Sequence, residues 1–509
     1  MDKTENITPF QHSISHDSGS TLSKKLSNNS TKNHSTQIIE ERSKEEFVYS
    51  LEEKRLLQKM NWFTVPFVVL VVFLQYLDKI TLNYSSVMNL FEDTNLSKNE
   101  FSLSGALYYV GFLVFLFPNQ YFMHRFPLSK YLGALLVLWG ITLACTAMAT
   151  NFAQLAILRC LLGFFESGAS PCTLMLITLL YRRREQPVLL SMIPSTMAFG
   201  GAMGGLIGYG FLNMEGFAGL SSWKWYMIVL GCATSVIGGI VFIFLPDNAY
   251  SRWYRLTSTE KEIVKERIQD SATTQQISMN FDHIWESLKD TRVYCYILIS
   301  FLLNLVNGAM SLYSTLLLKT LGHFSDTQAI LLSIPGSIIA ILLISMATYL
   351  NKYFKEYGYI GVLGCGITVL GLSLLIVVPE GYGVLSGIFL AIVGPQYTAF
   401  YSMTSANISG YTKKTFVVSI GFVAYCLGNF TGPLLLREEF APRYIPGIIA
   451  LIGALVITSL LFLYLRWSYM KENRYRQLLK KDNTLPPPSQ NVELDDLTDK
   501  KNLNFVYHV

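Results

Sequence analysis

Charged residues are scarce in this chain. Asp, Glu, Lys and Arg make up 15% of the 509 residues, against about 25% in soluble domains. Hydrophobic residues make up 51%, and apolar runs of about 20 residues, the length of a transmembrane helix, recur along most of the chain. This composition excludes a soluble globular protein and predicts an all-α membrane protein with many spans. The net charge of +5 is too small to indicate a nucleic-acid partner.

Motifs for metal binding, disulfides and hydrolytic chemistry are also lacking. The seven cysteines all fall in apolar runs, without a CxxC or a metal-ligand spacing, as is usual for small buried apolar side chains. The chain has no HExxH motif, no phosphate-binding loop and no GxSxG in a suitable context. We therefore expect no disulfide, no structural metal and no enzymatic activity.

Twelve apolar runs are present, in two groups of six. Residues 1–58 are polar and lack the apolar core of a signal peptide, so we predict a disordered tail. The predicted domains are a six-helix bundle in 59–245, a linker over 246–291 with charged helical character, a second bundle in 292–467 and a tail over 468–509. The spans are predicted near residues 62–84, 102–121, 130–150, 155–180, 188–212, 223–245, 292–318, 327–350, 358–378, 384–404, 415–436 and 444–467.

The short connections predict the orientation, because cytoplasmic loops are enriched in Lys and Arg. The connections on the N-terminal side hold nine such residues, and those on the other side hold about five. The nine are Arg125, Lys130, Arg182, Arg183, Arg184, Lys352, Lys355, Lys413 and Lys414. Both termini and the linker are therefore predicted to be cytoplasmic. Two halves of six spans fit a transporter with alternating access; a bundle with no transport role is the alternative.

The stretch RCLLGFFESGASP places Arg159 and Glu166 inside the apolar fourth span. Residues seven apart share a helix face but lie about 10 Å apart along the axis, so this pair does not form a local salt bridge. A charge at the bilayer centre costs about 3 kcal/mol or more. Each group therefore needs a partner on another helix, in a water-filled cavity or on a ligand. The structural alternative is an interhelical ion pair that only holds helices together.

The first span carries a second charged pair in LQYLDKITLN. Asp78 and Lys79 are adjacent, so their side chains diverge by about 100° around the helix. The alternative is a lysine that snorkels to the outer surface beside a solvated aspartate. A guanidinium matches a carboxylate bidentately, and a carboxyl group in a dry cavity binds a proton more readily. Two acids and two bases together suggest a site for an anion and a proton.

Polar residues of the second half are candidates to complete this site. They are Asn304, Asn307, Gln396, Tyr397, Tyr425 and Asn429. The alternative for each is a hydrogen bond between helices.

In the fifth span, Gly200, Gly204 and Gly208 form one GxxxG ridge and Gly201 and Gly205 another, which allows a neighbouring helix to approach closely. Static packing and a role in a rocking motion are both consistent with these ridges.

At these residues the chain resembles the major facilitator superfamily and, more narrowly, the fungal allantoate-permease family of anion:cation symporters. The resemblance runs from about residue 60 to the C-terminus. It rests on QYLDKITLNY, RCLLGFFESGASP, YRRREQP, LLSIPG, SGYTKKT, GNFTGPLLLREEFAPRYIPG and DLTDKKNLNFVY, which occur in this order.

The resemblance implies proton-driven uptake of a small carboxylate, such as allantoate, nicotinate, another vitamin-type acid, cysteine or a dipeptide. It implies that Arg159 contacts the substrate and that Glu166 takes part in proton coupling, with Asp78 and Lys79 as the acid–base pair of the first span. Tyr76 and Asn429 match positions implicated in substrate binding. The loop NQYFMHRFPLSK departs from the superfamily pattern, with His124 near the position of an expected aspartate; a lone histidine there is more often a surface residue.

We therefore expect a proton-coupled symporter of small organic anions. The expected substrate-binding residues are Arg159, Lys79, Tyr76, Asn429, Gln396, Tyr397 and Asn307, and the expected proton-coupling residues are Glu166 and Asp78. We expect no cofactor beyond the proton gradient, a carboxylate, protons and the lipid bilayer as partners, a functional monomer, and a plasma-membrane location. The alternative is a nutrient sensor that keeps the fold without net transport.

Overall fold

A computed structural model describes residues 50–182, 185–272, 280–391, 394–482 and 497–509. The predicted tail over 1–58 therefore lies almost wholly outside the described residues. The chain divides into two compact units, residues 1–57 and 58–509. Of the first unit, residues 50–57 are described, and they hold the start of helix α2. All of the remaining architecture belongs to the second unit, and the described residues of the chain form helices, turns and loops.

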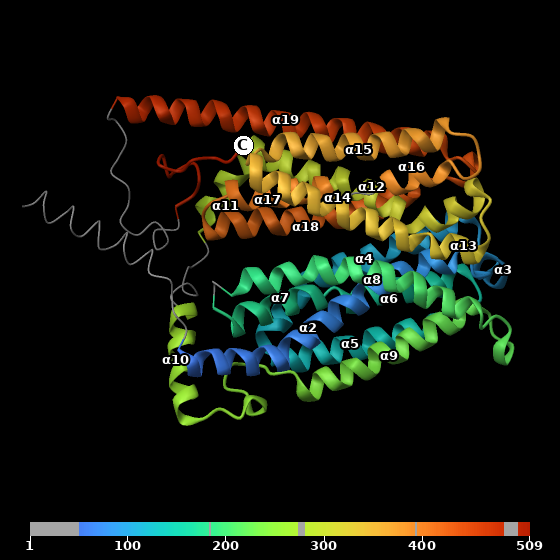
Figure 1. Ribbon diagram of the computed structural model, residues 1–509, viewed down its shortest axis with the longest axis horizontal. Helices are drawn as coiled ribbons and strands as arrows, with labels where there is room; N and C mark the ends of the chain where they lie inside the picture. The colour runs from blue at the N-terminus through green and yellow to red at the C-terminus, as the bar shows by residue number, and fades with distance from the viewer. Residues whose placement is uncertain (1–49, 183–184, 273–279, 392–393, 483–496) are drawn as a thin grey trace, which may run out of the picture. The chain divides into compact units, whose positions relative to one another are not determined.

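The first bundle comprises the helices up to residue 244 (Figure 1). They are α2 (Leu51–Ser85), α4 (Lys98–Arg125), α5 (Leu128–Thr146), α6 (Phe152–Glu166), α7 (Ala169–Leu180), α8 (Gln186–Leu212) and α9 (Ser222–Phe244), with the short α3 (Leu90–Thr94) and η1 (Phe217–Gly219) in connections. A capping box in which Ser97 and Glu100 satisfy each other's backbone N–H groups starts α4. The Asn151 side chain accepts from the Gln154 N–H and starts α6.

The second bundle lies beside the first (Figure 1). Its helices are α12 (Thr291–Gly322), α13 (Asp326–Leu331), α14 (Ser333–Phe354), α15 (Tyr357–Val377), α16 (Val384–Leu390), α17 (Pro395–Asn407), α18 (Tyr411–Leu434) and α19 (Ile445–Lys481), with η3 (Glu438–Phe440) before α19. The linker contributes η2 (Arg252–Tyr254), α10 (Ser258–Ala272) and α11 (Phe281–Leu288).

Twelve helical segments of the described residues are long and apolar enough to cross a membrane. The prediction of twelve spans in an all-α fold is confirmed, with α6–α7, α13–α14 and α16–α17 each forming one span. The ends differ from the hydropathy pattern, because α2 begins at Leu51 and α19 continues to Lys481. Apolar runs mark only the part of a helix inside the lipid, so polar extensions of the same helix escape them.

Small residues allow α4 and α6 to pack with their backbones in contact. A Cβ at Gly111 would collide with the Cys160 carbonyl oxygen, and a Cβ at Gly163 would collide with that of Tyr108. Only glycine fits these two crossing points. This contact brings Tyr108 on α4 next to the helix that carries Arg159 and Glu166.

The linker is divided between the two bundles. Its first helix is held to the first bundle, where Glu260 forms an ion pair with Lys59 (2.6 Å) and Arg267 with Glu185 (2.5 Å). The charged helix predicted from TSTEKEIVKERIQ is thus present as α10. The end of the bundles beside α10, where Lys59 pairs with Glu260, is called the linker side below, and the opposite end is called the far side.

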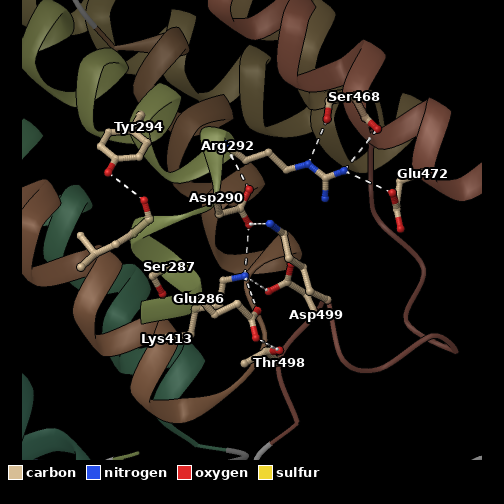
Figure 2. Close-up of polar contacts among 12 residues, drawn as sticks. Glu286, Ser287, Asp290, Arg292, Tyr294, Lys413, Ser468, Glu472, Thr498 and Asp499 are labelled. Atoms are coloured by element: carbon tan, nitrogen blue, oxygen red, sulfur yellow. Dashed lines mark hydrogen bonds and ion pairs between the residues drawn. The ribbon is translucent and has the colours of Figure 1, made fainter. Parts of the chain in front are cut away.

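The last residues of the chain fold back onto the linker side of the second bundle (Figure 2). We call residues 497–509 the C-terminal clasp. Lys413, at the start of α18, is 1% exposed and forms ion pairs with Glu286 (3.2 Å), Asp290 (3.3 Å) and Asp499 (2.8 Å). Thr498 donates to Glu286 (3.0 Å). One buried cation therefore joins α11, α12, α18 and the clasp.

The other end of the clasp is held by α19 and its neighbours. Arg476 donates to the carbonyl oxygens of Asn502 (3.1 Å) and Phe505 (2.7 Å). Asn473 pairs with the backbone of Tyr507, and Asn407 with that of His508. Together with the contacts of Lys413, these hydrogen bonds tie the clasp to α11, α17, α18 and α19 on the linker side.

The two bundles are joined by polar contacts on the far side. Asn83 donates to Ser314 (3.0 Å) and accepts from the Thr315 N–H (3.2 Å). Tyr84 donates to Ser333 (2.8 Å), and Ser102 hydrogen bonds to Tyr313. The backbone N–H of Lys98 donates to Glu438 (3.1 Å). These contacts hold the two bundles together on the far side.

The Glu215 carboxylate holds the far-side loop before α9 in place by hydrogen bonds. Glu215 accepts from the Ser222 backbone N–H (2.7 Å), from the Ser222 hydroxyl and from Asn89 (3.1 Å). Burial raises the pKa of Glu215, but these hydrogen bonds lower it by more, so it lies below its ordinary value of 4.5. The ionised carboxylate is therefore part of the folded loop.

Candidate functional site

Two adjoining cavities lie between the bundles. The smaller, of about 50 Å³, is lined by Asp78, Lys79, Arg159 and Glu166, with α12 residues such as Ser311 opposite. The larger, of about 360 Å³, lies toward the linker side, where its lining reaches Thr404 and Val417 near the ends of α17 and α18. We call them the charged cavity and the aromatic cavity. Lys79, Tyr108, Tyr109 and Glu166 line both, so these four residues stand at their junction.

Arg159 and Glu166 are buried without full hydrogen-bond partners. They are 3% and 2% exposed. Among the described residues the Arg159 Nε has no hydrogen-bond partner, and a terminal nitrogen reaches only the Met227 sulfur at 3.8 Å. The Glu166 Oε2 also lacks a partner there. Both side chains line the charged cavity, as their shared helix face predicts, and no ion pair shorter than 4 Å joins them.

Asp78 differs, because protein groups occupy both of its oxygens. The Trp139 indole N–H donates to one oxygen (2.6 Å) and the Thr81 hydroxyl approaches the other (3.3 Å). Asp78 is 3% exposed, so the alternative of a solvated aspartate is wrong. The Arg159 guanidinium interacts electrostatically with it. Asp78 is thus held in place by Trp139 and Thr81 in the cavity that Arg159 also lines, and its proposed share in proton coupling stays a prediction.

Lys79 lies between the two cavities rather than at the outer surface. Among described carboxylates it forms no ion pair shorter than 4 Å, and it interacts electrostatically with Glu166. Tyr76, one turn earlier on α2, lines the aromatic cavity and packs against Gly200. Both residues are therefore placed where a ligand between the bundles could touch them.

The predicted polar residues of the second bundle form a network of their own. Asn429 donates to Asn304 (2.9 Å) and accepts from Asn307 (2.9 Å), and Tyr397 donates to Asn304 (2.6 Å). The network joins α12, α17 and α18 behind the cavities, and Ser311 connects it to the charged cavity at 3.5 Å. In this structure these side chains therefore form hydrogen bonds between helices, which is the alternative stated for them above.

Gln396 lies away from both cavities. Its amide nitrogen donates to Thr368 on α15 (3.0 Å), and it is fully buried beside Gly364. The structure thus does not bring Gln396 together with Arg159 and Glu166. Tyr425, in contrast, lines the aromatic cavity.

The two glycine ridges of α8 face different partners. A Cβ at Gly200 or Gly204 would meet Tyr76 or Ile80 on α2, within the first bundle. A Cβ at Gly201 or Gly205 would meet Ser337 or Ser333 on α14, in the second bundle. Gly200 and Gly204 therefore pack helices of the same bundle, Gly208 meets both Tyr84 on α2 and Ile330 on α13, and the second ridge lies at the contact between the bundles.

Sequence reasoning missed three residues of the site. Trp139 holds Asp78 across helices, and Tyr108 and Tyr109 line both cavities. The adjacent tyrosines in an apolar span were a usable signal, whereas the pairing of Trp139 with Asp78 joins residues far apart in sequence. In the last turns of α4, His124 is exposed, as expected for a surface residue, while Asn119 is fully buried and accepts from Tyr131 (2.6 Å).

Comparisons with known proteins agree with this architecture. Residues 68–433 match the model of the Major Facilitator Superfamily. An uncharacterized transporter of Schizosaccharomyces pombe is 31% identical over 89% of this chain and 89% of its own. In Saccharomyces cerevisiae, the thiamine pathway transporter is 30% identical over 89% of this chain and 86% of its own, and allantoate permease is 28% identical over 92% and 89%.

A solved structure shares the fold at low identity. The inward-facing, occupied form of a bacterial homolog of the human lysosomal transporter Spinster has a TM-score of 0.66 and 14% identity, over 81% of this chain and 98% of that one. With the family match over most of the spans and these fungal relatives, the chain belongs to the Major Facilitator Superfamily as a membrane transporter related to fungal permeases of the allantoate-permease type.

Proposed function

We propose that this transporter carries a small organic anion together with a proton, by alternating access between the two bundles. The observation that carries the proposal is the incomplete pairing of Arg159 and Glu166. Both are buried in the charged cavity, and each keeps a polar atom without a partner among the described residues. Leaving such a group unpaired is costly, so the site is suited to a ligand that completes it.

The two groups have different chemistry. The Arg159 guanidinium is a planar donor that is always charged, and it matches a carboxylate. Glu166 can exist with or without a proton, and the protonated form lowers the charge cost of burial. In this proposal the anion binds Arg159 and the proton binds Glu166, so that the loaded site is better satisfied than the empty one.

The arrangement of the bundles supports alternating access. Polar contacts join the bundles on the far side, while the aromatic cavity extends toward the linker side. In the proposed orientation the linker side faces the cytoplasm and the membrane is the plasma membrane, with the protein acting as a monomer. The contact of Gly201 and Gly205 with α14 gives a surface on which the bundles can move.

Transport assays with two variants test the proposal. Labelled cysteine, nicotinate, allantoate, pantothenate and dipeptides are screened for uptake in cells without their own carriers. For the anion found, Glu166→Gln is expected to lose uphill, pH-dependent uptake and to keep exchange across the membrane. Arg159→Ala is expected to lose both.

Two results would contradict the proposal. Accumulation by Glu166→Gln against a gradient with unchanged pH dependence would remove the proton role. Wild-type affinity in Arg159→Ala would assign the arginine to scaffolding. If the wild-type protein moves none of these compounds but signals their presence, the chain is a sensor.

A further inference from the structure

The two cavities differ in a way that describes the transported molecule. The charged cavity, at about 50 Å³, has room for a small polar group, because one water already needs about 10–15 Å³ by the same measure. The aromatic cavity, at about 360 Å³, lies within the usual range of about 300–1,000 Å³ for small-molecule sites. Together they form one site with a compact charged end and a larger end.

The larger end is aromatic. Nearly half of its lining residues are Tyr or Phe, including Tyr401 and Phe422 from the second bundle, and Lys79 and Glu166 at the junction are its only charged lining residues among those described. Aromatic faces favour planar or apolar bodies that can stack or pack against them. A ligand body in this cavity therefore contacts rings and aliphatic groups.

The serine and threonine hydroxyl groups of its wall all donate within the protein, and its remaining hydroxyl groups belong to tyrosines. Ser170 donates to Gln75 (2.9 Å), Ser300 to the Gly421 carbonyl (2.9 Å) and Thr404 to the Phe400 carbonyl (2.8 Å). These three donors are not available to a ligand, so a ligand acceptor that loses water there gains no hydrogen bond from them. For its size the wall therefore offers few donors to the many polar groups of a polyol or a ureide.

The four ionisable groups of the charged cavity limit the ligand to a single negative charge. Arg159 and Lys79 are cations, and Asp78 and Glu166 are their anionic counterparts, so with all four ionised the charged cavity is neutral. When a proton neutralises Glu166, one positive charge is left over, and a monoanion balances it. A dicarboxylate would bring a second negative charge into a buried site without a partner.

Building on the proposed function, we infer that the substrate is a monocarboxylate with an aromatic or otherwise apolar body, bound with its carboxylate at Arg159 and its body among Tyr401, Phe422 and their neighbours. The same charge balance gives one proton for each anion.

Equilibrium binding to the purified protein at pH 5.5, measured by calorimetric titration, tests this inference. Benzoate and cyclohexanecarboxylate are the apolar monoanions, gluconate is the polyol, succinate is the dicarboxylate, and benzyl alcohol has the ring without the charge. We expect benzoate and cyclohexanecarboxylate to bind at least tenfold more tightly than the other three, and Arg159→Ala to lose this binding.

Variants of the wall give a second readout. Tyr401→Ser is expected to weaken benzoate binding at least fivefold and to leave gluconate unchanged, whereas Tyr349→Ser, at a side chain 67% exposed on α14 that does not line the cavity, changes neither. Phe422→Leu repeats the test with a variant that keeps an apolar side chain.

The outcomes distinguish an error in the substrate class from an error in the proposed function. If gluconate or succinate binds as tightly as benzoate and needs Arg159, the anion site stands and the substrate class is wrong. If Tyr401→Ser and Phe422→Leu both bind benzoate like the wild type, the aromatic cavity does not hold the body. If Arg159→Ala binds every anion like the wild type, or no anion binds the wild type, both the substrate class and the proposed function fall.

Discussion

Removing Lys413, the buried cation on α18 that pairs with the C-terminal clasp, tests how firmly this segment is held. In Lys413→Met the stem of the side chain remains, but the carboxylates of Glu286, Asp290 and Asp499 lose their shared partner. Breaking a buried ion pair by removing one partner costs about 3–5 kcal/mol, because a buried charge is left uncompensated. Lys413 is 1% exposed, so solvent does not replace it. We therefore expect the clasp to open much more often.

Amide hydrogen exchange measures this opening. The backbone N–H of Asn502 donates to the Thr498 carbonyl inside the clasp (2.9 Å). Its exchange reports local opening, and a cost of about 3–5 kcal/mol corresponds to exchange faster by a factor of about 10² to about 4,000. The matched control is Lys414→Met, because Lys414 hydrogen bonds only to Ser405 among the described residues.

A compensating change sharpens the result. Adding Asp499→Asn to Lys413→Met removes one of the stranded carboxylates, so part of the lost protection is expected to return. Equal protection of Asn502 in Lys413→Met and Lys414→Met would refute the reasoning, since it would mean that the ion pairs do not hold the clasp in place.

Three further predictions concern packing, the site and pH. Gly111→Ala forces a Cβ against a backbone carbonyl and should lower the unfolding temperature, while Gly239→Ala, with nothing within 4 Å, should not; overpacking of this kind costs about 1–3 kcal/mol. Trp139→Phe removes the hydrogen-bond donor to Asp78, so this carboxylate is free to compete with the anion for the Arg159 guanidinium. The apparent affinity for the anion should therefore fall about tenfold to a hundredfold, and an unchanged KM would contradict this. The pKa of Glu215 is lowered in the folded protein, so its ionised carboxylate stabilises the fold above pH 4.5, and this contribution is lost as the pH falls through the lowered pKa. Below pH 4.5 the unfolding temperature should therefore fall more steeply with pH for the wild type than for Glu215→Gln. Parallel pH dependences of the two proteins would exclude this role.

The spans and the buried pair could be predicted from the sequence because each depends on local patterns. Hydropathy runs mark the twelve crossings, and the spacing of seven places Arg159 and Glu166 on one face, where the structure has them. The contact of Trp139 with Asp78 could not be predicted in this way, since it joins two helices whose relative rotation the sequence does not encode locally.

Two residues show how the structure departs from local patterns. Lys413 is counted in the sequence as a basic residue of a short loop, but three carboxylates from distant segments surround it. Gln396 is a polar residue inside a span, like Asn429, yet it pairs with Thr368 away from the cavities. In both cases the role of the side chain depends on the residues that it contacts, and these are brought together by tertiary packing rather than by the local sequence.

Proton movement in vesicles tests the central claim most directly. The purified protein is sealed into liposomes with a pH-sensitive dye, and a gradient of the transported anion is applied without any pH gradient. We predict that wild-type protein moves protons with the anion at one to one, and that Glu166→Gln still exchanges the labelled anion but moves no protons. Proton flux in Glu166→Gln at the wild-type ratio would show that coupling does not take place at this carboxyl group.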